Sequence, residues 1–580
     1  MAQTGTIKVL DSSHVSPPPS SVPTTSLPLT HFDLPWFPCN IERLFFYKFS
    51  HPTLHFMETT LPMLKCSLSL TLQHFFPYAA NIMCPQPPGK PYIHYIDGDF
   101  VTFTVAESAA DFNHVKANYP RDIKLLRPFV PQLPPARVAE DGIRVCPITA
   151  FQVTVFPNSG ICIGSTYWHV VGDGKSFMHF MRSWTAVCRS GGDLTCLENS
   201  LPLINKDVIK DPGGIELVRL KNYWHWVSFS NENSGPTHAI AEDKVRATFV
   251  LGRAHAERLK HLVTGQCRDG VESEQLHIST FVVTCAFIWV CLIKSKDSAT
   301  NNLSRDDDDK FYFLLFPVDC RNRLEFPVPP TYFGNCLRPG VVDVTKSELI
   351  GENGILLASK VIGNKIKEME RSGLRGAEHW ISTLVERMKS SRLTAVAGSP
   401  KFHVYDTDFG WGRPCKVELT HIDYDGAISL AECKDEPGGI EVGEQEAAIL
   451  HGDGMMISGY PIIVKKAPER RQPTRDPSFG RENANISYQR TFRDVVADGR
   501  HFEGKDNCAK PRKVDDKPKV VDTSQEMNAQ SQSRKVKEKP KAAKKVKERI
   551  GASAFVPKLN VASSKKSGLG FVREGLCRDG

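Results

Sequence analysis

The stretch His169-Val170-Val171-Gly172-Asp173 places two side chains that can do chemistry four residues apart on a turn. Histidine is the side chain whose ordinary pKa suits proton transfer near neutral pH, so His169 is a candidate general base. Asp173 can pair with a cation and hold the turn in place. The spacing alone leaves a second interpretation open, in which His169 is a satisfied surface histidine and Asp173 only caps a helix.

The elements around this stretch are suited to presenting it. Residues 151–156, a turn at 157–160 and residues 161–168 predict a β-hairpin that ends at His169. A helix-like run, 176–184, follows. A polar, glycine-containing turn between a strand and a helix can hold a side chain out into a cleft. The sequence therefore predicts that the hairpin delivers His169 to a functional site.

Further motifs follow this stretch along the chain. One is Asp408-Phe409-Gly410-Trp411-Gly412, about 240 residues downstream of His169. Between the two lie Asp319-Cys320-Arg321-Asn322-Arg323 and Tyr332-Phe333-Gly334-Asn335-Cys336. In this order they resemble the motifs of the plant BAHD acyl-CoA-dependent acyltransferases. Y-F-G-N-C is similar to the subgroup that acylates anthocyanin and other phenolic glucosides. The resemblance covers residues 1–443.

The resemblance implies an α/β fold with a two-domain, chloramphenicol acetyltransferase-like architecture of mixed sheets and helices. We expect an N-terminal domain at 1–205, a crossover at 206–230 and a C-terminal domain at 231–464. Residues 465–580 are predicted to be a disordered basic tail that is not family-like, because the segment is Lys-rich and has few large apolar groups.

The resemblance also assigns roles to the chemical groups. His169 is expected to take the proton from an acceptor hydroxyl while that hydroxyl attacks the thioester carbonyl. Asp173 is expected to point away from substrate and to pair with an arginine, either Arg321 or Arg323. Asp408 belongs to the same candidate catalytic set, although a structural role in its turn is the favoured interpretation.

Four residues are expected along the channel between the two domains. The candidates for contact with substrate or coenzyme A are Trp36, Thr280, Ser399 and Trp411. Trp36 follows the family-like segment L-P-L-T-x-F-D-L and is a candidate for the acceptor pocket, but it can equally be a tryptophan packed under the first strand. Backbone amides at 396–399 are candidates for stabilising an oxyanion.

The implied reaction needs an acyl-CoA donor and a glycosylated phenolic acceptor. Malonyl and hydroxycinnamoyl groups both stay open as the acyl group. Acyl-CoA is a co-substrate, so no cofactor and no metal are expected. The 16 cysteines form no C-x-x-C pair and no zinc-like cluster with histidine, which indicates reduced thiols and a cytoplasmic protein. No signal peptide or membrane span is predicted, and we expect a monomer.

Charge is distributed unevenly along the chain. Residues 465–580 hold 29 Lys+Arg and 15 Asp+Glu, while the remaining residues hold 44 and 50. The mildly acidic body argues against nucleic-acid binding by the globular part. The basic tail is interpreted either as a fused or mispredicted gene end or as a segment that binds nucleic acid or an anionic surface.

The resemblance ends near Gly443, where the family's last strand and helix are replaced. If the strand at 438–443 pairs in a sheet, its altered end is expected to leave an unpaired edge. An impaired or inactive relative with a binding tail is therefore the alternative function. Strands are also expected at 404–408 and 417–424, on either side of D-F-G-W-G, and a nearly apolar, buried helix is expected at 279–292.

Overall fold

The computed structural model describes nine stretches of the chain, namely residues 7–37, 39–229, 245–265, 277–299, 309–388, 392–424, 427–444, 456–457 and 460–461. These residues lie within one compact unit, Met1–Phe502. The predicted disordered tail, 465–580, lies outside the described residues, as does Ser230, the last residue of the expected crossover.

A six-stranded sheet carries the hairpin that ends at His169. Its strands, in spatial order, are β1 (Ile7–Val15), β6 (Val101–Ser108), β10 (Thr149–Phe156), β11 (Gly160–Trp168), β3 (Asn40–Lys48) and β16 (Lys416–Leu419). Strands β10 and β11 pair antiparallel, as the sequence predicts. They are apolar and buried on both faces. Helices cover the sheet, so continuous apolar runs replace strict alternation.

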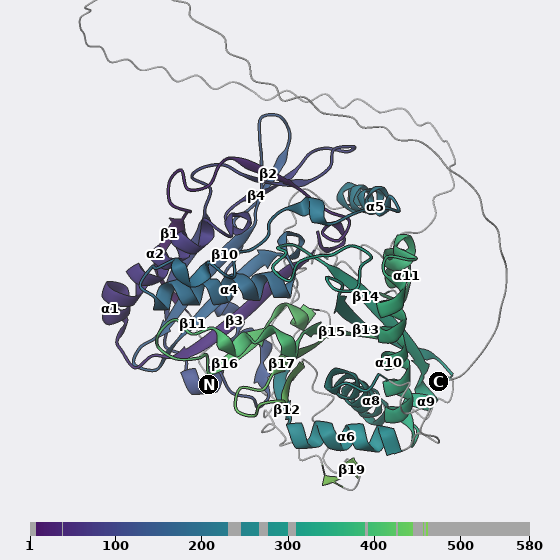
Figure 1. The fold of residues 1–580 in the computed structure, drawn as a ribbon. Helices are drawn as coiled ribbons and strands as arrows, with labels where there is room; N and C mark the ends of the chain where they lie inside the picture. Colours follow the sequence, from purple (N-terminus) through teal and green to yellow (C-terminus); the bar gives the residue numbers. More distant parts are fainter. Residues whose placement is uncertain are drawn as a thin grey trace, which may run out of the picture. The chain divides into compact units, whose positions relative to one another are not determined.

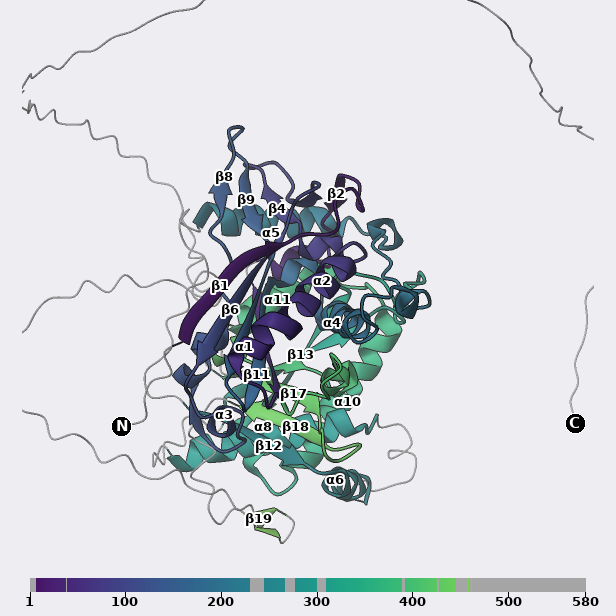
Figure 2. The same cartoon turned by 90° about the vertical axis from the view of Figure 1, so that its left-hand side faces the viewer.

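Helices α2 (Leu61–Leu72) and α4 (Gly174–Arg189) pack together over this sheet (Figures 1 and 2). The indole of Trp184 donates to the carbonyl of Leu64 at 3.3 Å. One hydrophobic cluster joins the sheet to α4 through Phe45, Tyr167 and Phe177, among others. This packing fixes α4, and therefore fixes the turn between β11 and α4.

A seven-stranded sheet forms the second large layer. Its order is β14 (Leu337–Thr345), β13 (Phe311–Asp319), β15 (Leu393–Gly398), β17 (Ile428–Glu432), β18 (Ile440–Glu444), β12 (Val245–Leu251) and β7 (Arg121–Asp122). Helices α8 (Thr280–Ala299) and α10 (Gly354–Ser372) pack on it around a separate apolar cluster. The buried helix predicted at 279–292 is confirmed as α8.

A five-stranded sheet and several helices complete the described part. The sheet runs β2 (Thr25–Pro28), β5 (Tyr92–Tyr95), β4 (Asn81–Cys84), β9 (Arg144–Pro147) and β8 (Arg137–Val138). The remaining α-helices are α1 (Thr53–His55), α3 (Phe112–Val115), α5 (Ile215–Phe229), α6 (Arg253–Gly265), α9 (Lys346–Ile350) and α11 (Ala377–Met388). A two-residue hairpin, β19 (Met456–Ile457) and β20 (Tyr460–Pro461), follows β18. None of the described helices is long and apolar enough to cross a membrane.

Each of the two large sheets contains one strand from the other half of the sequence. Strand β16, from the C-terminal half, pairs antiparallel with β3, so that Leu419 lies opposite Arg43. Strand β7, from the N-terminal half, pairs with β12. The buried carboxylate of Glu418 joins both exchanges, because Arg121 lies 2.6 Å and Arg246 2.8 Å from it. The predicted boundaries at 205 and 231 therefore separate sequence segments that share their sheets.

Near D-F-G-W-G, the strand expected at 404–408 is absent and the strand expected at 417–424 is shorter than expected. Residues Val404–Asp406 form a 3-10 helix, which begins after His403 at a left-handed φ of 51°. The second expected strand ends at Leu419, and His421–Tyr424 is again a 3-10 helix. In the first case the hydroxyl of Thr407 donates to the carbonyl of Val404 and closes the turn. Apolar residues alone did not distinguish these turns from strands.

The last family-like strand has no unpaired edge in the described part of the chain. Strand β18 pairs with β17 on one side and with β12 on the other, as far as Glu444. Val442, for instance, lies opposite both Leu430 and Phe249. The altered end beyond Glu444 lies outside the described residues apart from 456–457 and 460–461, so its expected effect on this sheet stays a prediction.

Candidate active site

His169 stands where β11 ends and the chain turns toward α4. Its backbone N–H donates to the carbonyl of Cys39 at 2.9 Å, which ties the turn to the start of β3. The residue is 7% exposed. Its ring stacks on the indole of Trp36, with centroids 4.1 Å apart and planes inclined by 10°. The structure thus brings Trp36, a candidate for the acceptor pocket, against the candidate base His169.

The surroundings keep His169 unprotonated. Burial lowers its pKa, and this effect outweighs the opposing charge of Asp173 and the hydrogen bonds near the ring. Its buried Nδ1 atom has no hydrogen-bond partner among the described residues. A neutral imidazole has one ring nitrogen free to accept a proton, which is what a general base requires.

Asp173 turns away from His169 and holds the turn together. It caps α4 by accepting from the Ser176 N–H at 3.0 Å. Arg321 donates to both of its oxygens, with Nη1 at 2.8 Å and Nη2 at 3.1 Å. The backbone N–H of Cys336 adds a bond at 3.2 Å. Burial would raise the pKa of Asp173, but the charge and hydrogen bonds of Arg321 lower it overall.

Arg323, the other candidate partner of Asp173, lies elsewhere. It donates to the backbone carbonyl of Asp319 at 2.6 Å and lies 3.2 Å from Glu370 on α10. Its side chain is 25% exposed, against 3% for Arg321. The expectation that includes Arg323 in the ion pair is corrected accordingly, because its guanidinium is held at the surface by α10.

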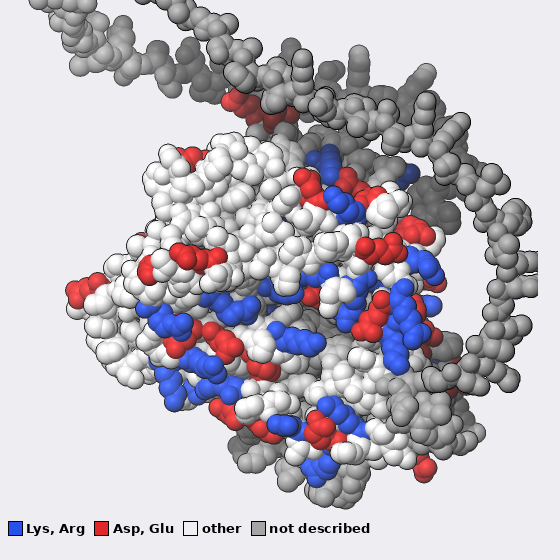
Figure 3. Space-filling model, in the orientation of Figure 1, with Lys and Arg blue, Asp and Glu red and all other residues white. Residues whose placement is uncertain are grey.

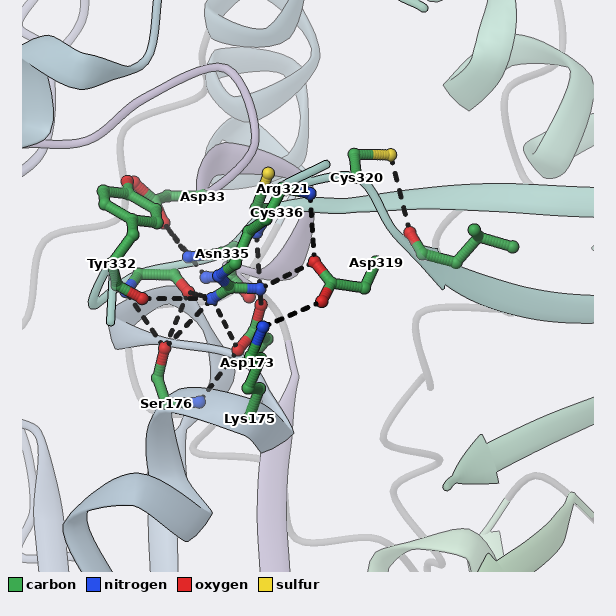
Figure 4. Close-up of polar contacts among 12 residues, drawn as sticks. Asp33, Asp173, Lys175, Ser176, Asp319, Cys320, Arg321, Tyr332, Asn335 and Cys336 are labelled. Atoms are coloured by element: carbon green, nitrogen blue, oxygen red, sulfur yellow. Dashed lines mark hydrogen bonds and ion pairs between the residues drawn. The ribbon is translucent and has the colours of Figure 1, made fainter. Parts of the chain in front are cut away.

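A second buried network supports the backbone of His169 itself. The Asn335 amide donates to the carbonyls of His169 at 2.9 Å and Val170 at 3.2 Å, and to Asp33 at 3.0 Å. Asp33 is fully buried and pairs with Lys206 at 3.2 Å. Figure 4 shows Asp33, Asn335 and the Asp173–Arg321 pair converging beside α4.

Sequence reasoning did not single out Asp33, Lys206 or Asn335 as functional residues. Asp33 and Asn335 lie inside the segments L-P-L-T-x-F-D-L and Y-F-G-N-C, but those segments served only as signs of resemblance. No periodicity marks a buried Lys206, which is 4% exposed. Charged groups that are buried only because a distant segment supplies their partner leave little trace in the local sequence.

Asp408 forms hydrogen bonds within its own turn. None of the described contacts joins it to another residue of the candidate site. Its carboxylate accepts from the N–H groups of Gly410 at 2.8 Å and Gly412 at 2.9 Å. Both glycines have φ above 100°, which a residue with a side chain rarely adopts. These contacts support the structural interpretation of D-F-G-W-G.

Trp411 packs against the core of the first sheet. Its ring stacks on Phe409, with centroids 5.4 Å apart, and meets Tyr47 and Phe49 edge-on. A ring held on three sides by aromatic neighbours is positioned for packing, so its expected place along the channel is not supported by these contacts. Trp411 stabilises the turn that begins at Asp408.

Thr280 and Ser399, two of the expected channel residues, each lie at the start of a helix. Thr280 is the first residue of α8, and Ser399 caps a 3-10 helix by accepting from the Lys401 N–H at 3.2 Å. Gly398 has a φ of +73°, and a Cβ there would lie 2.5 Å from the carbonyl of Leu430. This close approach explains why residue 398 is a glycine. The channel roles of Thr280 and Ser399 stay predictions.

A basic pocket opens beside α4. It has a volume of about 180 Å³ and is lined by Lys175, Ser176, His179, Arg182, Pro330, Thr331 and Tyr332. Lys175 also pairs with Asp319 at 3.3 Å. Figure 3 shows basic and acidic side chains interleaved across the middle of this face.

Two observations complete the chemistry of the site. No cluster of three or more histidine, cysteine or acidic side chains in the described part could hold a metal ion. Burial raises the pKa of the Cys320 and Cys336 thiols, which lie next to the Asp173 network, and Cys320 is raised to about 12. Thiols with raised pKa values are poor nucleophiles. His169 is thus the group in this network best suited to react.

His169 thus stands, buried and with a lowered pKa, at the end of a strand in a sheet that exchanges strands with a second sheet. The fold is that of vinorine synthase, with a TM-score of 0.54, 19% identity and coverage of 76% of this chain and 95% of that structure. It is also similar to F. sporotrichioides TRI101 complexed with coenzyme A and T-2, with a TM-score of 0.51, 16% identity and coverage of 74% and 96%.

The Transferase family model matches residues 7–444, and the chain belongs to this family of BAHD acyltransferases. Among curated relatives, it is 44% identical over 447 residues to Arabidopsis thaliana coumaroyl-CoA:anthocyanidin 3-O-glucoside-6''-O-coumaroyltransferase 1, covering 75% of this chain and 93% of the relative. It is 38% identical to the Dahlia pinnata malonyl-coenzyme A:anthocyanin 3-O-glucoside-6''-O-malonyltransferase, covering 75% and 93%.

Proposed function

We propose that this enzyme transfers a malonyl or hydroxycinnamoyl group from coenzyme A to a sugar hydroxyl of an anthocyanin or other phenolic glucoside. The observation that carries the proposal is the neutral His169, anchored at Cys39 and stacked on Trp36. The names of the relatives supply the substrate classes, since they include coumaroyl and malonyl transferases acting on glucosides.

The reaction proceeds in a complex that holds both substrates. His169 accepts the proton of the acceptor hydroxyl as its oxygen attacks the thioester carbonyl. The resulting tetrahedral intermediate collapses, the bond to sulfur breaks, and coenzyme A leaves as a thiolate. The proton on His169 then neutralises that thiolate, so the base is restored and no external proton is needed.

The roles of the neighbouring residues follow from their contacts. Asp173 and Arg321 fix the turn between β11 and α4, and Asn335 fixes the carbonyl of His169. Trp36 stacks on the ring of His169 and so limits its rotation. Held in this way, the base loses little freedom when substrate binds, which favours reaction.

The alternative of an inactive relative rested on the altered chain end. Strand β18 is paired on both sides as far as Glu444, and the His169 network is complete without any later residue. These observations favour an active enzyme. The expected monomer, the cytoplasmic location and any binding by residues 465–580 stay predictions.

Release of coenzyme A by the purified full chain tests the proposal. Malonyl-CoA and coumaroyl-CoA are each supplied with a panel of flavonoid and anthocyanin glucosides, beside His169→Ala and a chain ending at residue 464. We expect thiol release that requires a glucoside and disappears in His169→Ala. Folded protein that releases no thiol with any pair of substrates would contradict the proposal.

A further inference from the structure

Two polar side chains that the reaction leaves unused, Arg43 and His421, lie beside His169 at the start of β3. Strand β11 pairs with one edge of β3 and β16 with the other. His169 follows β11 and bonds the carbonyl of Cys39, while His421 follows β16, and the Glu42 N–H donates to its Nδ1 at 3.5 Å. Both histidines thus contact the start of β3, His169 from the side of β11 and His421 from the side of β16.

The bond from Glu42 fixes the chemical form of His421. A nitrogen that accepts a hydrogen bond carries no proton, so the proton of the neutral ring is on Nε2. Burial, followed by the charges of His169 and Arg43, lowers the pKa of His421 to about 3. His421 is therefore a neutral hydrogen-bond donor at physiological pH. The residue is half-buried, and no described residue accepts from Nε2.

Arg43 is a buried cation without an ion-pair partner among the described residues. It is 4% exposed, its Nη1 donates to the sulfur of Met178 at 3.1 Å, and its Nε has no partner. Removing an arginine from water without a carboxylate is costly. A ligand whose oxygens accept from the guanidinium would offset that cost.

The charge around Arg43 indicates which kind of ligand fits. Glu432 attracts Arg43 without forming an ion pair with it. One of its oxygens accepts from the Tyr405 N–H at 2.9 Å, and the other is buried without a partner. The cation and the carboxylate balance each other, so a second negative charge would meet repulsion from Glu432. A neutral ligand rich in oxygen atoms suits this arrangement better than an anion.

We propose that Arg43 and the Nε2–H of His421 form a subsite for the acceptor's glycosyl unit, donating hydrogen bonds to its hydroxyl oxygens beside His169. This inference rests on the proposed function, in which the same sugar carries the hydroxyl that His169 deprotonates. A donor on β3 and a donor on the segment that follows β16 would hold the sugar and select it against acceptors without one, because buried polar groups left unpaired are costly.

Steady-state kinetics of the full chain with a flavonoid glucoside test the subsite. His421→Leu and Arg43→Gln are compared with the wild type and with His379→Leu, a control on α11 whose side chain is 78% exposed. We expect the KM for the glucoside to rise at least tenfold in both variants. The KM for each acyl-CoA should stay unchanged in both variants, as should all parameters of the control.

Each other result has a definite meaning. An unchanged glucoside KM in His421→Leu overturns the subsite, and this variant decides the matter if Arg43→Gln does not fold. A rise in the malonyl-CoA KM alone in Arg43→Gln, with coumaroyl-CoA unaffected, also overturns it and assigns Arg43 to the donor carboxylate. A wild-type enzyme without glucoside-dependent thiol release instead contradicts the proposed function, which separates the two failures.

Discussion

Asp173 accepts hydrogen bonds from Arg321 on both carboxylate oxygens, at 2.8 and 3.1 Å, while the ring of His169, four residues earlier, stacks on Trp36. His169 and Asp173, the two ends of H-x-x-x-D, therefore have different roles. His169 is available for proton transfer, and Asp173 joins the start of α4 to the segment that follows β13. Losses of activity at the two positions should consequently have different physical origins.

Replacement of Asp173 by asparagine should destabilise the protein. The change leaves the buried Arg321 without its counter-charge, which costs about 3–5 kcal/mol. Urea unfolding should show this loss, and Arg323→Gln is the control, because that side chain is partly exposed and should change stability by no more than about 0.5 kcal/mol. If Asp173→Asn kept its stability but lost turnover, Asp173 would have a chemical role.

The pH dependence of catalysis should reflect the buried state of His169. Its pKa lies below the ordinary 6.5, so the ring stays unprotonated until the solution is more acidic than that. A plot of kcat/KM against pH should therefore be flat from pH 8 to 6.5 and fall on further acidification, as the base gains a proton. A midpoint above 6.5 would contradict the dominance of burial over the charge of Asp173.

Asp408→Ala should act on the turn and leave the chemistry intact. Two backbone N–H groups lose their acceptor, which costs about 1–3 kcal/mol. Thermal unfolding should occur at a lower temperature, while kcat per folded molecule remains that of the wild type. Asp406→Ala is the matched control, since its pair with Arg413 at 3.0 Å lies on the surface and contributes little. A selective fall in kcat would instead indicate catalysis.

Acid should weaken the junction between the exchanged strands through Glu418. Burial would raise its pKa, but the charges of Lys416, Arg246 and Arg121 lower it well below the ordinary 4.5. A depressed carboxylate pKa gives stability that is complete above 4.5 and is lost as the pH falls below it. Urea midpoints at pH 7 and pH 4 should differ more in the wild type than in Glu418→Gln. Equal differences would contradict this assignment.

The sequence alone was sufficient to predict the fold and the site where the evidence lies in a local pattern or a short motif. The hairpin before His169, the buried helix α8 and the family itself followed from periodicity and four short motifs. The sequence did not decide whether Arg321 or Arg323 pairs with Asp173, because the two arginines lie only two residues apart in one segment. Only the position of α10, whose Glu370 draws Arg323 to the surface, separates them.

The remaining parts of the site depend on contacts between distant segments. Asn335 bonds residues 166 positions away, and the Glu42 N–H meets His421 across 379 positions. No local pattern marks either residue as polar and buried. The strand expected at 404–408 is absent, and the one expected at 417–424 ends at Leu419, because the chain turns within runs that contain apolar residues.

The strand exchange gives this enzyme a fixed order of assembly during synthesis. The sheet that carries His169 ends in β16, so it cannot close until residue 419 has left the ribosome. Until then the outer edge of β3 remains open to pairing with another chain. A fragment that stops before residue 416 keeps that edge permanently, which makes it prone to aggregate even though it contains the whole H-x-x-x-D motif. The catalytic base thus becomes usable only after both halves of the enzyme have been translated.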